Sequence, residues 1–328
     1  MPQKKGKLVV AELRKRSEKG LTLAKKILHS EKMEYPKLQE ALDHYLKNWA
    51  DFTHPGLFSM SYEAVGGNLD NVESPQAAIA MMAAAFDIFD DIIDKSEDKH
   101  SIPTVYGKFG TDIAILLGNA FLIEGFNLFV ESAAILPEET RKKALGAYKK
   151  LLFEVGNAHA LEVGLKHEVN VDPDANLKVI EMKAAGIEAD VYLGALFGRG
   201  TEAEVEASAK IGRILGILIT LREEFVDVFE LEELRQRIAT QNLPLPLLFA
   251  LNDQNAKKNI EEILLKPKIT REDIDALVDL TLEAEPVKNL KKKMQLLMKK
   301  GSSLCYDLSS LKLQRVFQVL LQFMLEDL

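Results

Sequence analysis

The sequence predicts an all-α protein. Glycine and proline are sparse and scattered, with 19 and 11 among 328 residues, so few points interrupt a helix. Apolar residues recur at the three- and four-residue spacing of a helix face in nearly every segment. Alternation of apolar and polar residues, which is typical of a half-buried strand, is absent. We therefore expect an all-helical bundle.

Prolines and turn residues set the expected helix boundaries. Pro36 and Pro75 suit the first turn of a helix, where the missing amide hydrogen costs nothing. Pro137 and the two acids after it suit another first turn. Residues 53–56 are expected to break the helical pattern, and Gly186 marks a second expected break. The expected helices cover residues 9–28, 36–49, 57–65, 75–95, 111–132, 137–165, 177–197, 202–229 and, after several shorter helices, 311–325.

Length and composition fit one large domain over residues 1–328. Hydrophobic residues make up 47% of the chain, enough for a large core, and no repeat or low-complexity linker divides it. Residues 1–30 are expected to form a basic helix, but the net charge of −8 argues against nucleic-acid binding. No run of eighteen uncharged apolar residues occurs, so no transmembrane helix is expected. The single cysteine, Cys305, cannot form an internal disulfide, which suits a cytoplasmic protein.

Four aspartates share one face near the end of an apolar helix. Asp87, Asp90, Asp91 and Asp94 are three, four and seven residues apart, so their side chains meet. Their repulsion costs the helix roughly 0.2–0.5 kcal/mol per pair unless cations neutralise it. Carboxylates suit Mg²⁺, which usually binds through one or two of them together with a substrate's phosphates. Because the preceding residues 81–86 are too apolar for an outer surface, this stripe predicts a site for a metal-bound diphosphate.

A second apolar helix also delivers carboxylates to its carboxyl-terminal end. Glu223, Glu224 and Asp227 follow the apolar residues 211–219 and lie on one helical face. Two such helix ends that faced each other would surround Mg²⁺ and a diphosphate with oxygen ligands.

Taken in order, these motifs resemble the trans-prenyl diphosphate synthases. A DDxxD motif alone is a weak signal, but the ordered set covers most of the chain. The matching segments are residues 90–94, 103–106, 110, 116–120, 180–185, 215–216, 223–227 and 243–251.

The resemblance implies the isoprenoid synthase fold, a large helical bundle around a central active-site cavity. It also implies Mg²⁺-dependent ionisation of an allylic prenyl diphosphate, whose cation an alkene then attacks in a pocket that excludes water. The second metal motif has glutamates where the family usually has aspartates. The residues that map onto the two metal motifs are Asp90, Asp91 and Asp94, and Glu223, Glu224 and Asp227.

Further substrate contacts follow from the same resemblance. Lys183 matches the family's diphosphate-binding lysine, and Arg222 is expected to assist it. Lys99 and His100 fall where the family has paired arginines. Thr220 replaces the glutamine of the second motif. One turn before the metal motif, Phe86 is expected to form a floor for the prenyl chain, with Ala85 leaving a way round it, although both also suit helix packing.

The half of the site that binds isopentenyl diphosphate departs from the family. Where the family has Gly-Lys-Arg-x-Arg-Pro, this chain has residues 51–55, which lack lysine and arginine and contain His54. Each charge-assisted phosphate contact is worth roughly 1.5–3 kcal/mol, so losing three or four would weaken that site by orders of magnitude.

Three functions stay open on the sequence. The first is condensation of an allylic diphosphate with isopentenyl diphosphate, using His54, Lys99 and His100 at a rewired site. The second uses the allylic diphosphate alone, as a terpene-synthase-like lyase or a transferase to another acceptor. The third is a non-catalytic partner subunit, and the intact aspartate stripe argues against it. The family usually forms homodimers, so a homodimer or a heteromer is expected.

Overall fold

Helix dominates the computed structural model, which describes residues 2–49, 51–99, 101–165, 172–239, 242–326 and 328. The all-α prediction is therefore confirmed. The long helices are α1 (Pro2–Ser30), α2 (Pro36–Asn48), α3 (Thr53–Ala64), α4 (Glu73–Asp94), α6 (Thr111–Ala133), α7 (Glu138–Leu165), α8 (Pro173–Lys183), α9 (Ala185–Phe197), α10 (Glu202–Phe229), α14 (Arg271–Glu283), α15 (Glu285–Leu304) and α16 (Leu311–Phe323). The shorter elements are η1 (Leu69–Asn71), β1 (Asp98–Lys99), β2 (Ile102–Pro103), α5 (Val105–Phe109), α11 (Leu231–Ala239), α12 (Leu245–Ala250), α13 (Lys257–Leu264) and η2 (Cys305–Asp307).

Two expected helix breaks occur near the site but fall a few residues before the expected positions. Thr53 to Pro55 form the first turn of α3, because a proline is tolerated there and the Asp51 carboxylate accepts the Thr53 amide at 2.8 Å. The later break falls at Ala184 rather than Gly186, so α8 ends at Lys183. A two-residue antiparallel pairing of β1 with β2, which the absence of alternation did not predict, follows α4.

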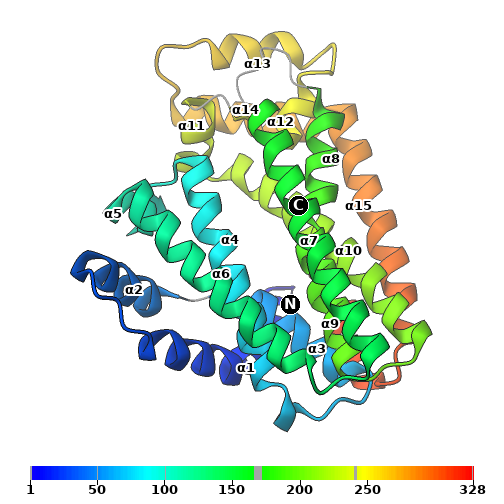
Figure 1. The fold of residues 1–328 in the computed structure, drawn as a ribbon. Coiled ribbons are helices and arrows are strands. Elements are labelled where there is room, and N and C mark those ends of the chain that lie inside the picture. The colour runs from blue at the N-terminus through cyan, green and yellow to red at the C-terminus, as the bar shows by residue number, and fades with distance from the viewer. Residues whose placement is uncertain (1, 50, 100, 166–171, 240–241, 327) are drawn as a thin grey trace.

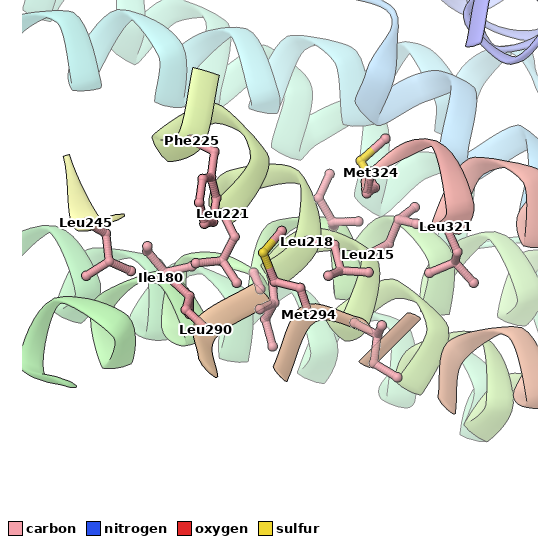
Figure 2. Packing of buried hydrophobic residues seen from close by; sticks show 14 of the residues in the cluster. Ile180, Leu215, Leu218, Leu221, Phe225, Leu245, Leu290, Met294, Leu321 and Met324 are labelled. Carbon is pink, nitrogen blue, oxygen red and sulfur yellow. The ribbon is translucent and has the colours of Figure 1, made fainter. Parts of the chain in front are cut away.

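The helices pack through three apolar clusters. One joins α4 and α6 to α2 and α5, and a second joins α3, α7 and α9. The largest gathers α10, α12, α15 and α16, and Figure 2 shows Phe225 and Leu221 of α10 among Leu245, Leu290 and Met294. Figure 1 shows α6 running beside α4, and α15 beside α10. The packing thus fixes the ends of α4 and α10, which carry the two acidic motifs.

Helix α6 packs closely against α4 on one side and exposes apolar side chains on the other. A Cβ atom at Gly118 would lie 2.6 Å from the ring of Phe89, so a larger residue there would require this ring to move. By length and composition α6 is the one helix in the described part of the chain that is apolar enough to cross a membrane, and 39% of its most apolar window is buried. The sequence rule based on uncharged runs did not identify this helix.

The close approach of α10 to the junction of α8 and α9 also depends on a glycine. A Cβ atom at Gly216 would lie 2.9 Å from the Cα atom of Ala184, directly after Lys183. Gly146 of α7 has no atom within 4 Å of such a Cβ.

We expect Gly216→Ala and Gly146→Ala to change stability in opposite directions. Gly216→Ala should lower the free energy of unfolding by roughly 1–3 kcal/mol, because backbone must move to admit the methyl group. Gly146→Ala should raise it by up to about 1 kcal/mol, because alanine favours an exposed helix interior. Denaturant unfolding followed by circular dichroism measures both, and equal effects at the two positions would contradict the packing described.

Candidate functional site

A cavity of about 680 Å³ lies where the ends of α4 and α10 approach each other, which is the usual size for a small-molecule site. Its polar end carries carboxylates from both helices. The apolar end is formed by α4 and α7, including Ile79, Met82, Tyr148, Leu151 and Val155. Ile79 lies about 16 Å before Asp90 along α4 at the rise of an α-helix, so the cavity is deep enough for an extended hydrocarbon chain.

The first acidic motif faces this cavity. Asp90 and Asp91 line it, and the Lys99 ammonium from β1 lies 2.7 Å from Asp87 and 2.7 Å from Asp91. Burial raises the pKa of Asp91 to about 6, although Lys99 opposes the shift. Asp94 ends α4 and does not line the cavity, but its charge adds to the burial that raises the pKa of Asp90. The helix end therefore carries buried carboxylates that favour a cation nearby.

Lys183 joins the first motif to α7. Its ammonium lies 2.6 Å from Glu162, and His159 Nε2 lies 3.5 Å from Asp90. Burial alone would lower the pKa of Lys183, but Glu162 and Asp90 together raise it, so the lysine stays charged. Burial and the neighbouring Lys183 lower the pKa of His159, which leaves that imidazole neutral. A cation thus lies beside Asp90 at the mouth of the cavity.

Only one carboxylate of the second motif faces the cavity. Glu223 lines it, and burial, helped by Asp227 and Glu224, raises the pKa of Glu223 to about 7. Glu224 and Asp227 turn instead to the guanidinium of Arg237 on α11. The two helix ends therefore do face each other, but the second contributes fewer open oxygens than the sequence suggested.

His54 forms an ion pair inside the same cavity. Its Nδ1 lies 2.6 Å from Oδ2 of Asp190 on α9, whose side chain is 4% exposed. Burial alone would lower the pKa of His54, but Asp190 and more distant carboxylates raise it to about 9. His54 is thus a cation near neutral pH on the segment where the family carries arginine.

The structure places some of the other expected substrate contacts at the cavity and others away from it. Thr220 and Phe86 line the cavity, whereas Ala85 packs in the α4 and α6 cluster and opens no path round Phe86. Arg222 does not line the cavity, and its expected diphosphate contact is corrected: it donates to the carbonyls of Phe323 and Glu326 and lies over the Phe323 ring. Arg222 points this way because it lies on the face of α10 that packs against α16. His100 lies outside the described residues.

The residues at the mouth fit a hard divalent cation on the α4 side. Asp90 Oδ1 is buried and accepts no hydrogen bond, which is costly unless a ligand supplies a positive partner. The donors there are carboxylate oxygens, the type that Mg²⁺ prefers. Among the described residues, no three acidic, histidine or cysteine side chains form a complete metal cage. This agrees with an ion that takes one or two carboxylates and completes its shell with phosphate and water.

Sequence reasoning missed several members of the site. His159 and Glu162 match no zinc-ligand spacing, yet their three-residue separation puts both on one face of α7, where His159 meets Asp90 and Glu162 meets Lys183. Asp190 carried no motif, since a lone acid in an apolar helix gives no sign of its partner across 136 residues. Arg237 follows the second motif in the sequence, but its contact with Glu224 and Asp227 depends on packing that the sequence does not specify.

Comparisons with known proteins place this chain among characterised relatives. A family model described as Polyprenyl synthetase matches residues 35–281. The short chain isoprenyl diphosphate synthase of Methanothermobacter thermautotrophicus is 27% identical over 197 residues, which cover 60% of this chain and 60% of that protein. The geranylgeranyl diphosphate synthase of Sulfolobus acidocaldarius is 25% identical over 58% of each chain. The chain thus matches about three fifths of the length of these relatives.

Solved structures show the fold over nearly the whole chain. The crystal structure of geranylgeranyl pyrophosphate synthetase from Pyrococcus horikoshii has a TM-score of 0.84 and 21% identity, covering 99% of this chain and all of that one. The enzyme of the same kind from Corynebacterium glutamicum, complexed with isoprenyl diphosphate and magnesium, has a TM-score of 0.78, 20% identity and coverage of 96% and 97%. The isoprenoid synthase fold expected from the sequence is therefore confirmed.

We expect the His54–Asp190 pair to be visible in histidine titrations. The His54 imidazole should titrate near pH 9, and Asp190→Asn should bring its pKa back toward or below the ordinary value of about 6.5, because burial then dominates. Imidazole NMR signals measure this, with the His54 signal identified by its loss in His54→Gln.

The same pair makes stability depend on pH. The folded-state pKa lies above the unfolded value of about 6.5, so the contribution is complete below pH 6.5 and is lost as the pH rises through 9. The difference in unfolding free energy between the wild type and His54→Gln should shrink across that window. A constant difference, or an unshifted titration, would show that the pair does not hold a proton.

Proposed function

The chain belongs to the polyprenyl synthetase family, and from that premise we propose that it transfers the prenyl group of an allylic diphosphate to isopentenyl diphosphate. One observation carries the proposal: Asp90, Asp91 and Glu223 meet Lys183 at the mouth of a deep apolar cavity. Carboxylates and a cation suit a metal-bound diphosphate, and the apolar end suits its hydrocarbon tail.

In this proposal Asp90 and Asp91 hold Mg²⁺, with Glu223 on the opposite side of the mouth. When bound, Mg²⁺ supplies the Lewis acidity that stabilises negative charge on the departing diphosphate. The unsatisfied Oδ1 atom of Asp90 and the raised pKa values of Asp91 and Glu223 support these residues as ligands, because bound cations stabilise ionised carboxylates.

Lys183 and Lys99 bind the departing diphosphate. Lys99 lies 2.7 Å from Asp91, whereas Lys183 lies 2.6 Å from Glu162 of α7 and interacts electrostatically with Asp90. Charge-assisted hydrogen bonds from these cations stabilise the leaving group as its negative charge develops. Ile79, Met82 and Leu151 exclude water from the reacting carbon, which protects an allylic cation from hydrolysis.

His54 supplies the positive charge on the acceptor side. It lines the cavity from the first turn of α3, the segment where the family carries its arginines, and Asp190 keeps it protonated. We propose that the diphosphate of isopentenyl diphosphate binds beside His54. This single imidazolium replaces several cations, so a weak affinity for isopentenyl diphosphate is expected.

We also propose that the chain forms a homodimer through α6. Leu116, Ile123 and Val130 are seven residues apart and 54%, 61% and 39% exposed, with Phe126 beside them at 42%. This spacing forms a continuous apolar seam of the kind that packs against a second helix. A long apolar face exposed on one side of a helix is typical of an interaction surface, and a second copy offers the same seam.

We expect Asp90→Asn to lower turnover by about 10²–10³-fold or more, since it removes a metal ligand while keeping the size of the side chain. The matched control is Asp279→Asn, at an exposed position of α14, which should keep wild-type turnover. The assay supplies Mg²⁺ with geranyl, farnesyl or geranylgeranyl diphosphate, each with and without isopentenyl diphosphate, and identifies products by mass. Elongated products that form only with isopentenyl diphosphate would support the proposal. A hydrocarbon or an alcohol that forms without it would show that isopentenyl diphosphate is not the acceptor.

We expect Ile123→Lys to convert a dimer to a monomer, because it places a charge in the middle of the seam. Leu265→Lys, at an 83% exposed position after α13, makes the same change away from α6 and should leave the dimer intact. Analytical ultracentrifugation measures both masses. A monomeric wild type, or an Ile123→Lys dimer, would rule out this interface.

A further inference from the structure

The second acidic motif already holds a cation that the chain itself supplies. Arg237, in the last turn of α11, donates from Nη1 to Glu224 Oε1 at 3.0 Å and from Nη2 to Glu224 Oε2 at 3.1 Å. The same Nη1 also donates to Asp227 Oδ2. One guanidinium therefore contacts both carboxylates that would complete the motif.

This arrangement is anchored on both sides. Glu224 Oε2 also accepts the backbone amide of Leu245 at 2.6 Å, and Arg237 Nε donates to the carbonyl of Asn242 at 2.8 Å. The side chains of Arg237 and Glu224 are 14% and 18% exposed. The two-pronged pairing is therefore held by backbone of the segment that leads into α12, and little water reaches it.

The first motif is arranged differently. Lys99, whose side chain is 43% exposed, contacts Asp91 through a single ammonium, and Asp90 Oδ1 accepts no hydrogen bond, with the His159 imidazole 3.5 Å away. A lysine on a flexible stem gives way to a ligand more easily than a buried, forked guanidinium. Arginine also stays protonated at every accessible pH, so Arg237 is a permanent cation. The two motifs thus differ in whether a metal has an open place to bind.

We propose that Arg237 is a resident cation that stands in for a metal at the second acidic motif. Glu224 and Asp227 then hold Arg237, while metal binds on the side of Asp90 and Asp91 with Glu223 facing it. The inference rests on the proposed function, because it concerns how the same diphosphate site is charged. It makes Arg237 a positioning residue, and it means that the site needs fewer metal ions than two fully open motifs would take.

The number of bound metal ions tests this without turnover. Mn²⁺ serves as the probe for the metal and inorganic pyrophosphate as the probe for the diphosphate, and electron paramagnetic resonance counts the Mn²⁺ ions bound per chain. Arg237→Gln should bind one more Mn²⁺ than the wild type, because it frees two carboxylates. Arg237→Lys, which keeps a cation, should bind the wild-type number.

The matched control is Arg235→Gln on the same helix. Arg235 contacts Glu232 and the carbonyl of Ile269 and no carboxylate of the motif, so its loss should leave the Mn²⁺ count unchanged. Equal counts for the wild type and a folded Arg237→Gln, as judged by circular dichroism, would overturn the proposal.

A second set of variants decides the matter if Arg237→Gln does not fold. In the wild-type background, Glu224→Gln and Asp227→Asn should keep the full Mn²⁺ count, whereas Asp90→Asn should lose at least one ion. A lower count in Glu224→Gln would assign that carboxylate to a metal and overturn the proposal. Failure of the proposed function gives a different result, because the wild type would then bind no Mn²⁺ with pyrophosphate at all.

Discussion

Repulsion among buried carboxylates is the constraint on which this structure depends. Two apolar helices bring their acidic ends together, and burial raises the pKa of Asp90, Asp91, Glu223 and Asp227 alike. Such an arrangement persists only if positive charge is supplied close by. Lys99, Lys183 and Arg237 provide part of this positive charge. A ligand that enters the mouth of the cavity would provide the rest.

The rest of the molecule holds these ends in place. Helix α10 packs against α9 and α15, and α4 packs against α6. Arg213 of α10 adds polar ties, because it binds Glu154 of α7 and the carbonyl of Glu181 in α8. These contacts hold the acidic ends of the two helices near each other. Charge that would otherwise be solvated is thereby concentrated at the entrance of an apolar cavity.

The cations are distributed unevenly, and this distinguishes the two sides of the site. Lys99 pairs with Asp91 and Lys183 with Glu162 on the side proposed for the leaving group, while the side proposed for the acceptor has one imidazolium held by Asp190. Arg237 offsets part of the negative charge of the second acidic motif, because it pairs with both Glu224 and Asp227. Under the proposed function, the charges that would ionise a prenyl diphosphate are present, whereas far less positive charge is available for a second diphosphate.

The sequence by itself determined the helices, their order and the two acidic ends, because helix periodicity and the spacing of Asp90, Asp91 and Glu223 are local properties. It also indicated Lys183, Lys99 and His54 as cations of the site. Only the tertiary structure decided how those charges are paired. The separation of Arg222 from the site, the placement of Arg237 on Glu224, and the meeting of His54 with Asp190 all depend on how helices far apart in sequence pack. Periodicity shows which face of a helix is buried, but it does not specify which residue of another helix meets that face. The charged residues that meet there determine how each charge is paired.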